Sequence, residues 1–166
     1  TVKRKRNNFE ASGGVAYRIV RSDDVDNALV DYHKIYSKSW KDAESHPQFI
    51  DGLVRHYSDT GMLRLGFIHK EGVPVASQLW LVSNGTAYIY KLAYDRDYAE
   101  YSVGTLLSRY LFEAVITEDK VHTIDYLTGD DGYKADWMDS RRELYGVRCF
   151  NLGTARGLIS GGRSFA

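Results

Sequence analysis

The stretch YKLAYDRDYAEYSVGTLL, residues 90–107, decides the fold of this chain. A β-like segment ends at Tyr94, a polar stretch spans residues 95–100, and apolar residues at helical spacing begin after Ser102. The stretch therefore predicts a strand, a loop and a helix in succession. Unpaired amides at the start of such a helix attract anions, and Gly104 would let a phosphate approach the backbone closely. The same pattern also fits a plain N-cap at Ser102 and a packing glycine.

The segments on both sides of this stretch alternate between helical and β-like patterns. Upstream, apolar spacing and turn signals predict a strand, two helices and three strands over residues 17–20, 25–36, 47–61, 62–69, 73–82 and 86–94. Downstream, they predict a helix, a strand, a short helix and a last strand over residues 102–114, 121–127, 133–138 and 145–152. This order indicates one mixed α/β domain that contains an antiparallel meander.

The predicted domain covers residues 17–152. Residues 1–16 are interpreted as a basic tail or linker, because a run of basic residues from Lys3 to Arg6 is typical of a solvated segment. Residues 153–166 are rich in Gly and Ser and are interpreted as a flexible tail. Since the chain begins at Thr1 instead of Met, we expect it to be processed or cut from a longer protein.

Composition excludes several classes of protein. The 166 residues are 43% hydrophobic and 27% charged, which does not fit a disordered chain, collagen or a coiled coil. The 22 basic and 22 acidic residues cancel, so the net charge provides no attraction to DNA or to an anionic membrane. No apolar run approaches the roughly 20 residues of a membrane span. The single Cys149 suits a reducing compartment, so we expect a cytoplasmic protein without membrane insertion or DNA binding.

Four segments resemble known proteins: SW at residues 39–40, YKLAYD at 90–95, YSVGTLL at 101–107 and DYLTGDDGYKADW at 125–137. Together with the element order, they resemble the GNAT acyltransferase superfamily. Within it, the chain is most similar to the CelD-like branch, described as involved in cellulose biosynthesis, which is similar in turn to the FemAB-like peptidyltransferases. The resemblance covers about residues 17–152. It implies a GNAT-like fold, in which a mostly antiparallel sheet with flanking helices contains a parallel fourth and fifth strand that splay apart.

The resemblance implies acetyl-CoA or another acyl-CoA as co-substrate. Its pantetheine arm would enter the splay and hydrogen bond to the backbone of the fourth strand, at Leu92, Ala93 and Tyr94. Its pyrophosphate would bind amides of the loop and of the first helical turn that follow, at Ser102, Val103, Gly104, Thr105 and Leu106. The argument from the helix start, made on the residues alone, points to the same place for an anion.

The resemblance also implies roles in catalysis. In many superfamily members a Tyr on the helix after the fifth strand protonates the departing thiolate, and Tyr133 falls in that position. A carboxylate near the splay, alone or through a water molecule, would accept a proton from the attacking amine; the candidates are Asp95, Asp125 and Asp130. Each of these residues also fits a structural role, as a capping or surface carboxylate or as a packed tyrosine.

Other polar and aromatic side chains are candidates for substrate binding: Trp40, Gln78, Trp80, Lys91 and Lys134. The tryptophans and the glutamine would line an acceptor pocket, and the lysines would hold a substrate carboxylate or a CoA phosphate. Core packing and ordinary surface exposure explain the same residue types.

Three tyrosines lie on the predicted strand of residues 86–94. Period-two alternation places Tyr88, Tyr90 and Tyr94 on one strand face, where they would suit a sugar, an acyl chain or a hydrophobic core.

Three hypotheses for function remain open. The first is an N-acyltransferase that moves an acyl group, most simply acetyl, from acyl-CoA directly to an amine of a small-molecule or saccharide-related acceptor. The second is a FemAB-like transferase with aminoacyl-tRNA as donor. The third is a catalytically degenerate GNAT-like binding domain of a polysaccharide-related protein, because Ala99 and Ser102 depart from the superfamily's phosphate-loop pattern. No metal site is predicted, since the five histidines lack paired ligand spacing.

Overall fold

The computed structural model describes residues 2–164, in which one compact unit ends at Gly129 and a second begins at Asp130. Thr1, Phe165 and Ala166, which belong to the two predicted tails, lie outside the described residues. The strands are β1 (Val15–Val20), β2 (Leu63–Lys70), β3 (Val73–Ser83), β4 (Thr86–Tyr94) and β5 (Thr123–Asp125). The helices are α1 (Val2–Ala11), α2 (Val25–Lys38), α3 (Pro47–Asp59), α4 (Val103–Thr117) and α5 (Ala155–Ser164), with the 3-10 helices η1 (Arg96–Tyr101) and η2 (Gly132–Asp136).

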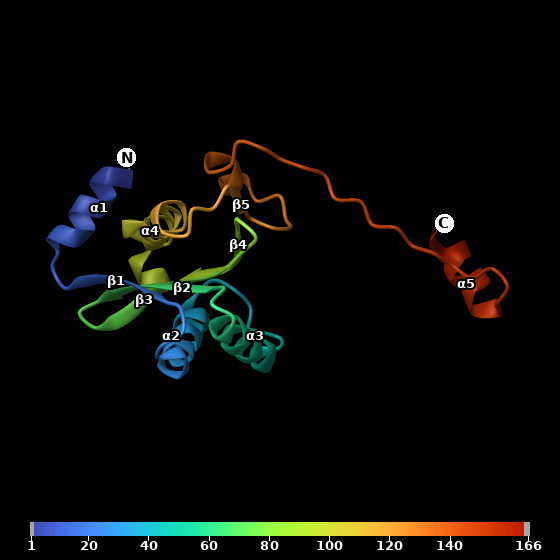
Figure 1. Ribbon diagram of the computed structural model, residues 1–166, viewed down its shortest axis with the longest axis horizontal. Coiled ribbons are helices and arrows are strands. Elements are labelled where there is room, and N and C mark those ends of the chain that lie inside the picture. Colours follow the sequence, from blue (N-terminus) through green and yellow to red (C-terminus); the bar gives the residue numbers. More distant parts are fainter. Residues whose placement is uncertain (1, 165–166) are drawn as a thin grey trace. The chain divides into compact units, whose positions relative to one another are not determined.

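Within the described residues the first unit contains one sheet, with its strands in the order β1-β2-β3-β4-β5. The first four strands pair antiparallel, and β4 pairs parallel with β5. Figure 1 shows α2 and α3 on one side of this sheet and α4 on the other. This arrangement confirms the predicted mixed α/β class, with a mostly antiparallel sheet, one parallel strand pair and flanking helices.

The hairpin turns have the backbone that their sequences predict. Glu71 and Gly72 have φ of 51° and 77°, and Asn84 and Gly85 have φ of 49° and 70°. Two successive positive φ angles match the right-handed twist of the flanking strands, and Asn-Gly is a favoured sequence for such a turn. These turns fix the register of β2, β3 and β4.

A continuous apolar core fills the space between the sheet and the α2 and α3 helices. Its fully buried members come from both helices and from three strands, and they include Tyr32, Ile35, Val54, Leu65 and Leu79. Burying side chains of this size contributes about 1.5–3 kcal/mol each. The core therefore holds α2 firmly against the sheet.

An ion pair between Arg64 and Asp119 joins β2 to the segment just after α4. The Arg64 Nε and Nη2 atoms donate to the two Asp119 carboxylate oxygens over 2.9 and 2.6 Å, and both side chains are about nine-tenths buried. The Nη1 atom donates to the carbonyl oxygens of Gly61 and Leu63. The buried guanidinium and the buried carboxylate thus pair with each other, as burial of charges requires.

The N-terminal segment differs from its prediction. Residues 2–11 form α1 where a tail or linker was expected, because Phe9 is fully buried and holds the helix in place. Its ring lies 5.0 Å from that of Tyr101 and 6.4 Å from that of Tyr98, both on η1. The basic run predicts a solvated segment, whereas the burial of one apolar residue, Phe9, decides where this segment lies.

The C-terminal unit also differs. The predicted strand over residues 145–152 is wrong, because residues 141–151 form neither helix nor strand. A strand needs a neighbour to satisfy its backbone, and here Tyr145 and Val147 are 84% and 87% exposed. Residues 155–164 form α5 instead of an irregular tail. The predicted single domain over residues 17–152 stays a prediction.

Candidate functional site

The strands β4 and β5 pair over a short length and then part. Their register joins Thr86 with Thr123, Ala87 with Ile124 and Tyr88 with Asp125. Among the described residues, no strand pairs with the remaining part of β4 on this side, from residue 89 to residue 94. The second half of β4 therefore presents an open edge, and Figure 1 shows β4 and β5 at the end of the sheet.

Backbone direction decides which groups face this open edge. The Asp95 amide donates to the Val75 carbonyl of β3 over 2.9 Å, and the register pairs Ser77 with Ala93. Since successive residues of a strand direct their backbone groups to opposite sides, Ala93 also faces β3. The backbone groups of Leu92 and Tyr94 face the open edge. The prediction that the Ala93 backbone binds the pantetheine arm is thus corrected, because the N–H and C=O of Ala93 face β3.

A β-bulge in β4 changes which side chains share a face. The pairing with β3 shifts between Leu79 and Trp80, which leaves Tyr90 as the extra residue of β4. Tyr90 packs against the α2 and α3 core, whereas the Tyr94 ring lies next to Gly104 of α4. The prediction that Tyr88, Tyr90 and Tyr94 share one face is therefore wrong, because an extra residue reverses the alternation beyond the bulge.

The helix α4 begins directly beside the end of β4. Ser102, its N-cap, has a left-handed backbone with φ 54° and ψ 43°, and its hydroxyl makes no cap hydrogen bond. The Leu106 amide donates to the Ser102 carbonyl over 3.1 Å, so it already has a helical partner. The amides of Val103, Gly104 and Thr105 belong to the first turn, where an α-helix provides no internal acceptor. They point out of the helix end that favours an anion.

A lysine from the N-terminal helix reaches this helix start. The Lys5 Nζ atom of α1 donates to the Ser102 hydroxyl over 2.6 Å. A cation at a helix N-terminus lies at the unfavourable end of the dipole unless an anion is also bound there. Lys5 and the first turn of α4 together form a positively charged corner.

An aromatic contact joins this corner to the loop after α2. The rings of Trp40 and Tyr94 lie 4.6 Å apart, centroid to centroid. A β-carbon on Gly104 would lie 3.1 Å from the Tyr94 Cδ1 atom. The Tyr94 ring therefore lies between Trp40 and Gly104 at the end of β4. Trp40 keeps 43% of its surface exposed. The structure brings these three predicted residues together.

Two other predicted acceptor residues are buried in the core on the α4 side. Gln78 is 1% exposed, and its Nε2 atom donates to the Gly104 carbonyl and to the Ser108 hydroxyl, each over 2.9 Å. Its Oε1 atom accepts from the Trp80 indole, and Trp80 is fully buried. The prediction that Gln78 and Trp80 line a pocket is corrected: they anchor the first turns of α4 to β3.

Lys91 of β4 lies on the opposite face of the sheet, toward α2. Its ammonium forms an ion pair with Glu44, and the two side chains are 21% and 15% exposed. It also lies 5.4 Å from the centre of the Tyr36 ring. Burial opposes the charged form of Lys91, but the hydrogen bond to Glu44 and the nearby Tyr36 outweigh it and raise the pKa of Lys91. Lys91 therefore stays protonated at neutral pH.

Asp95 ends β4 in a buried, fully partnered position. It is 4% exposed; one carboxylate oxygen accepts from the Asp97 amide over 3.1 Å and the other from the Lys38 Nζ atom over 2.9 Å. This hydrogen bond and the charge of Asp95 raise the pKa of Lys38. Asp95 caps η1 and fixes the turn between β4 and α4, which fits positioning better than proton transfer.

Asp125 ends β5 directly opposite Tyr88. It is partly exposed, and its carboxylate accepts from the Leu127 amide over 2.7 Å. Of the two predicted carboxylates in the first unit, Asp95 and Asp125, only Asp125 lies where β4 and β5 begin to part.

The other predicted residues belong to the second unit. Tyr133 and Lys134 lie on η2, and Lys134 pairs with Asp131 over 3.3 Å. Burial, and then the charge of Asp131, raise the pKa of Tyr133. Its phenol therefore stays protonated at neutral pH. Asp130 pairs with Arg141 over 3.0 Å at the surface.

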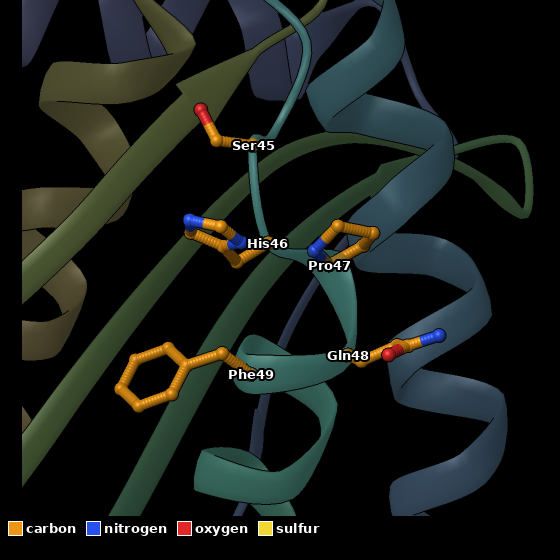
Figure 2. Close-up of a pocket in the computed structure, with 5 residues that line it drawn as sticks. All are labelled: Ser45, His46, Pro47, Gln48 and Phe49. Atoms are coloured by element: carbon orange, nitrogen blue, oxygen red, sulfur yellow. The ribbon is translucent and has the colours of Figure 1, made fainter.

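A small hollow lies at the start of α3, lined by Ser45, His46, Pro47, Gln48 and Phe49. Figure 2 shows the side chains of His46 and Phe49 on one side of the backbone and that of Gln48 on the other. The Phe49 ring is 57% exposed. The hollow follows the loop of Trp40 and Glu44 along the chain.

Sequence reasoning missed Lys5, Tyr36 and Glu44. Lys5 belongs to a basic run that the sequence predicts to be solvated, and nothing local marks which member of that run contacts Ser102. Tyr36 follows the helical spacing of the predicted helix over residues 25–36, which carries no signal of a site residue. A carboxylate in the loop before Pro47 was the available signal for Glu44, but its partner lies 47 residues along the chain.

Two features are absent from residues 2–164. These residues contain no helix with the length and apolar character needed to cross a membrane. In the same part of the chain, no three His, Cys, Asp or Glu side chains are grouped so that they could hold a metal ion.

The chain matches a family of known proteins. Residues 1–135 match the model of the family described as acetyltransferase (GNAT) domain. No curated protein sequence matches the chain.

Solved structures show the same fold. A possible acetyltransferase from Clostridium difficile 630 has a TM-score of 0.60 at 12% identity, covering 84% of this chain and 100% of that one. An aminoglycoside acetyltransferase from an uncultured soil metagenomic sample, in complex with sisomicin, has a TM-score of 0.57 at 14% identity, with coverage of 84% and 98%. A predicted acetyltransferase with acetyl-CoA from Clostridium acetobutylicum has a TM-score of 0.57 at 13% identity, with coverage of 81% and 96%. At these identities the likeness concerns the fold.

Proposed function

Because the chain belongs to the GNAT acetyltransferase family, we propose that it transfers an acetyl group from acetyl-CoA to an amine. The observation that carries this proposal is the open edge of β4 next to the uncapped start of α4. The first offers backbone hydrogen bonds to an extended chain, and the second offers amides and positive charge to a pyrophosphate. The donor combines both features, because its extended pantetheine arm is joined at one end to the pyrophosphate.

The donor would bind mainly through backbone groups of the protein. Leu92 and Tyr94 direct their backbone groups to the open edge, where they would hold the pantetheine arm. The amides of Val103, Gly104 and Thr105 would hold the pyrophosphate, and Lys5 would add a charge-assisted hydrogen bond to it. Ser102 adopts the left-handed backbone at this turn without being a glycine.

The transfer exchanges one bond for another. The amine nitrogen bonds to the thioester carbonyl carbon, and the carbon–sulfur bond breaks. Backbone N–H groups of β4 would stabilise the negative charge that develops on the carbonyl oxygen. By the sequence resemblance, Tyr133, whose phenol keeps its proton at neutral pH, would give that proton to the departing thiolate. The amine proton would pass to Asp125, directly or through water.

The acceptor and the setting follow from the sequence resemblance. A small-molecule or saccharide-related amine and a CelD-like context belong to this proposal on that basis. A cytoplasmic location belongs to it because the single Cys149 suits a reducing compartment. Acetyl is the simplest acyl group for the donor. A second candidate, a domain that binds the donor without turnover, is favoured by Ala99 and Ser102 in the phosphate loop.

The test is a turnover assay with a panel of primary amines. The chain is incubated with acetyl-CoA and each amine, free CoA thiol is followed with a thiol reagent, and mass spectrometry detects the acetylated amine. Amine-dependent thiol release with a matching product supports the proposal. Acetyl-CoA binding without product from any amine supports the binding domain instead.

A further inference from the structure

The helix α1 is anchored by a single aromatic side chain. It lies beside η1 and α4, on the side of the sheet that α4 covers (Figure 1). Of the described residues 2–11 that form it, only Phe9 is buried. The Phe9 ring packs against the rings of Tyr98 and Tyr101 on η1. The packing of the whole helix therefore depends on the Phe9 contact.

Phe9 also sets the register between α1 and the segment that leads into α4. The rings of Phe9 and Tyr101 lie 5.0 Å apart, centroid to centroid. The Lys5 Nζ atom donates to the hydroxyl of Ser102, the next residue of that segment, over 2.6 Å. Residues four positions apart lie on one face of a helix, separated by about 6 Å along its axis. The Phe9 contact therefore brings Lys5 to the first turn of α4.

The neighbouring cations of α1 are directed elsewhere. The Arg6 Nε atom donates to the Glu10 carboxylate of the same helix over 2.8 Å. Arg4 and Lys3 precede Lys5 by one and two residues, which turns them away from it by about 100° and 200° around the helix. The register that Phe9 sets thus selects Lys5 from the basic run for contact with α4.

We propose that Phe9 is a positioning residue for the donor: its packing holds Lys5 where the donor's pyrophosphate binds, and the bound pyrophosphate in turn holds α1 in place. This inference rests on acetyl-CoA as the proposed donor and extends its binding to a residue that does not touch it. The Lys5 ammonium lies at the positive end of α4, where a cation is unfavourable until an anion binds. A bound pyrophosphate attracts both Lys5 and the helix start, so it removes this penalty.

The two effects must be equal in size. If docking of α1 through Phe9 strengthens acetyl-CoA binding by a given factor, acetyl-CoA must strengthen the docking of α1 by the same factor. We expect a factor of about three to ten, as for one charge-assisted contact to a phosphate. This reciprocity allows two independent measurements of one quantity.

The first measurement is a double-mutant cycle, in which calorimetric titration of the full chain gives the affinity for acetyl-CoA. Phe9→Ala should weaken binding about threefold to tenfold, as Lys5→Gln does. The double variant should bind no more than about twofold weaker than Lys5→Gln alone, because both changes remove the same contact. Phe9→Leu, which keeps an apolar side chain at this place, should restore most of the affinity.

Two results of this cycle would overturn the proposal. One is unchanged affinity in Phe9→Ala. The other is a larger further loss when Phe9→Ala is added to Lys5→Gln, because Phe9 would then act on the shape of η1 and not through Lys5.

The second measurement needs no variant, because α1 contains trypsin sites at Lys5 and its basic neighbours. Cleavage of a packed segment follows the fraction of time for which it is open, when reclosing is fast. Saturating acetyl-CoA should slow cleavage within α1 about threefold to tenfold. Cleavage at the exposed Arg148 of the second unit should keep its rate. Cleavage of α1 at the same rate with and without acetyl-CoA, or equal slowing at Arg148, would overturn the proposal.

The outcomes separate this inference from the proposed function. Acetyl-CoA binding that is indifferent to Phe9→Ala would overturn the inference and leave the proposed function standing. Absence of acetyl-CoA binding to the unchanged protein would overturn both.

Discussion

The Tyr94 ring lies so close to Gly104 that a β-carbon on this glycine would be 3.1 Å from Cδ1 and 3.5 Å from Cε1 of the ring. This contact joins the last residue of β4 to the first turn of α4. It brings the two halves of the proposed donor site together, since Tyr94 faces the open edge and Gly104 belongs to the anion-binding turn. A change of size at either residue should therefore alter donor binding before it alters the fold.

Gly104→Val should weaken acetyl-CoA binding by about tenfold or more. The branched side chain would push the Tyr94 ring outward and would cover the amides of the first turn. Tyr94 is only partly buried and contacts the exposed Trp40, so the ring can move and the fold should persist. Calorimetric titration measures the affinity, and an unchanged circular dichroism spectrum serves as control. Unchanged affinity would contradict the placement of the donor at this turn.

Lys5→Gln should weaken acetyl-CoA binding about threefold to tenfold, as expected for the loss of one charge-assisted contact to a phosphate. The matched control is Lys3→Gln, which removes the same charge from an exposed position of the same helix. Titrations at low and high salt should show a smaller salt dependence for Lys5→Gln than for the control. Equal behaviour of the two variants would remove Lys5 from the site.

Tyr133→Phe should lower kcat by about 100-fold, the lower end of the usual contribution of general acid catalysis, and should leave acetyl-CoA affinity unchanged. The pKa of Tyr133 is raised above its usual 10.0, so the phenol keeps its proton as pH rises. Turnover of the unchanged protein should accordingly show no loss from this group between about pH 7 and 9, the range below the usual tyrosine pKa. Steady-state kinetics across this range provide the check; full activity of the variant would end the assignment.

Asp119→Ala should destabilise the first unit by about 3 kcal/mol, because it leaves the Arg64 guanidinium buried without its partner. Urea unfolding followed by fluorescence would measure this loss. Glu118→Ala is the matched control, since its pair with Arg21 is exposed and should contribute less than about 1 kcal/mol. Similar losses in both variants would contradict the burial of the Arg64 pair.

Local patterns predicted most of the first unit. The turns at Gly72 and Gly85 and the first-turn Pro47 fixed element boundaries because their backbone preferences act over a few residues. The apolar spacing that begins at Ser102 likewise predicted α4. Signals of this range need no knowledge of the partner elements.

The remaining features depend on contacts that spacing does not encode. The bulge at Tyr90 reverses the faces of β4, and one buried ring, Phe9, turns a basic run into a packed helix. Gln78 looked like a pocket residue because its hydrogen-bond partners, Gly104 and Ser108, lie 26 and 30 residues away. Long-range packing therefore decided which predicted site residues face the site.

Calorimetric titration of the purified chain with acetyl-CoA tests the central claim most directly. We expect saturable, one-to-one binding with a micromolar Kd, which corresponds to about 8 kcal/mol. The melting temperature should rise with acetyl-CoA concentration, because the ligand binds the folded state. No heat at several temperatures, together with an unchanged melting temperature at high acetyl-CoA concentration, would contradict an acetyl-CoA site between β4 and α4.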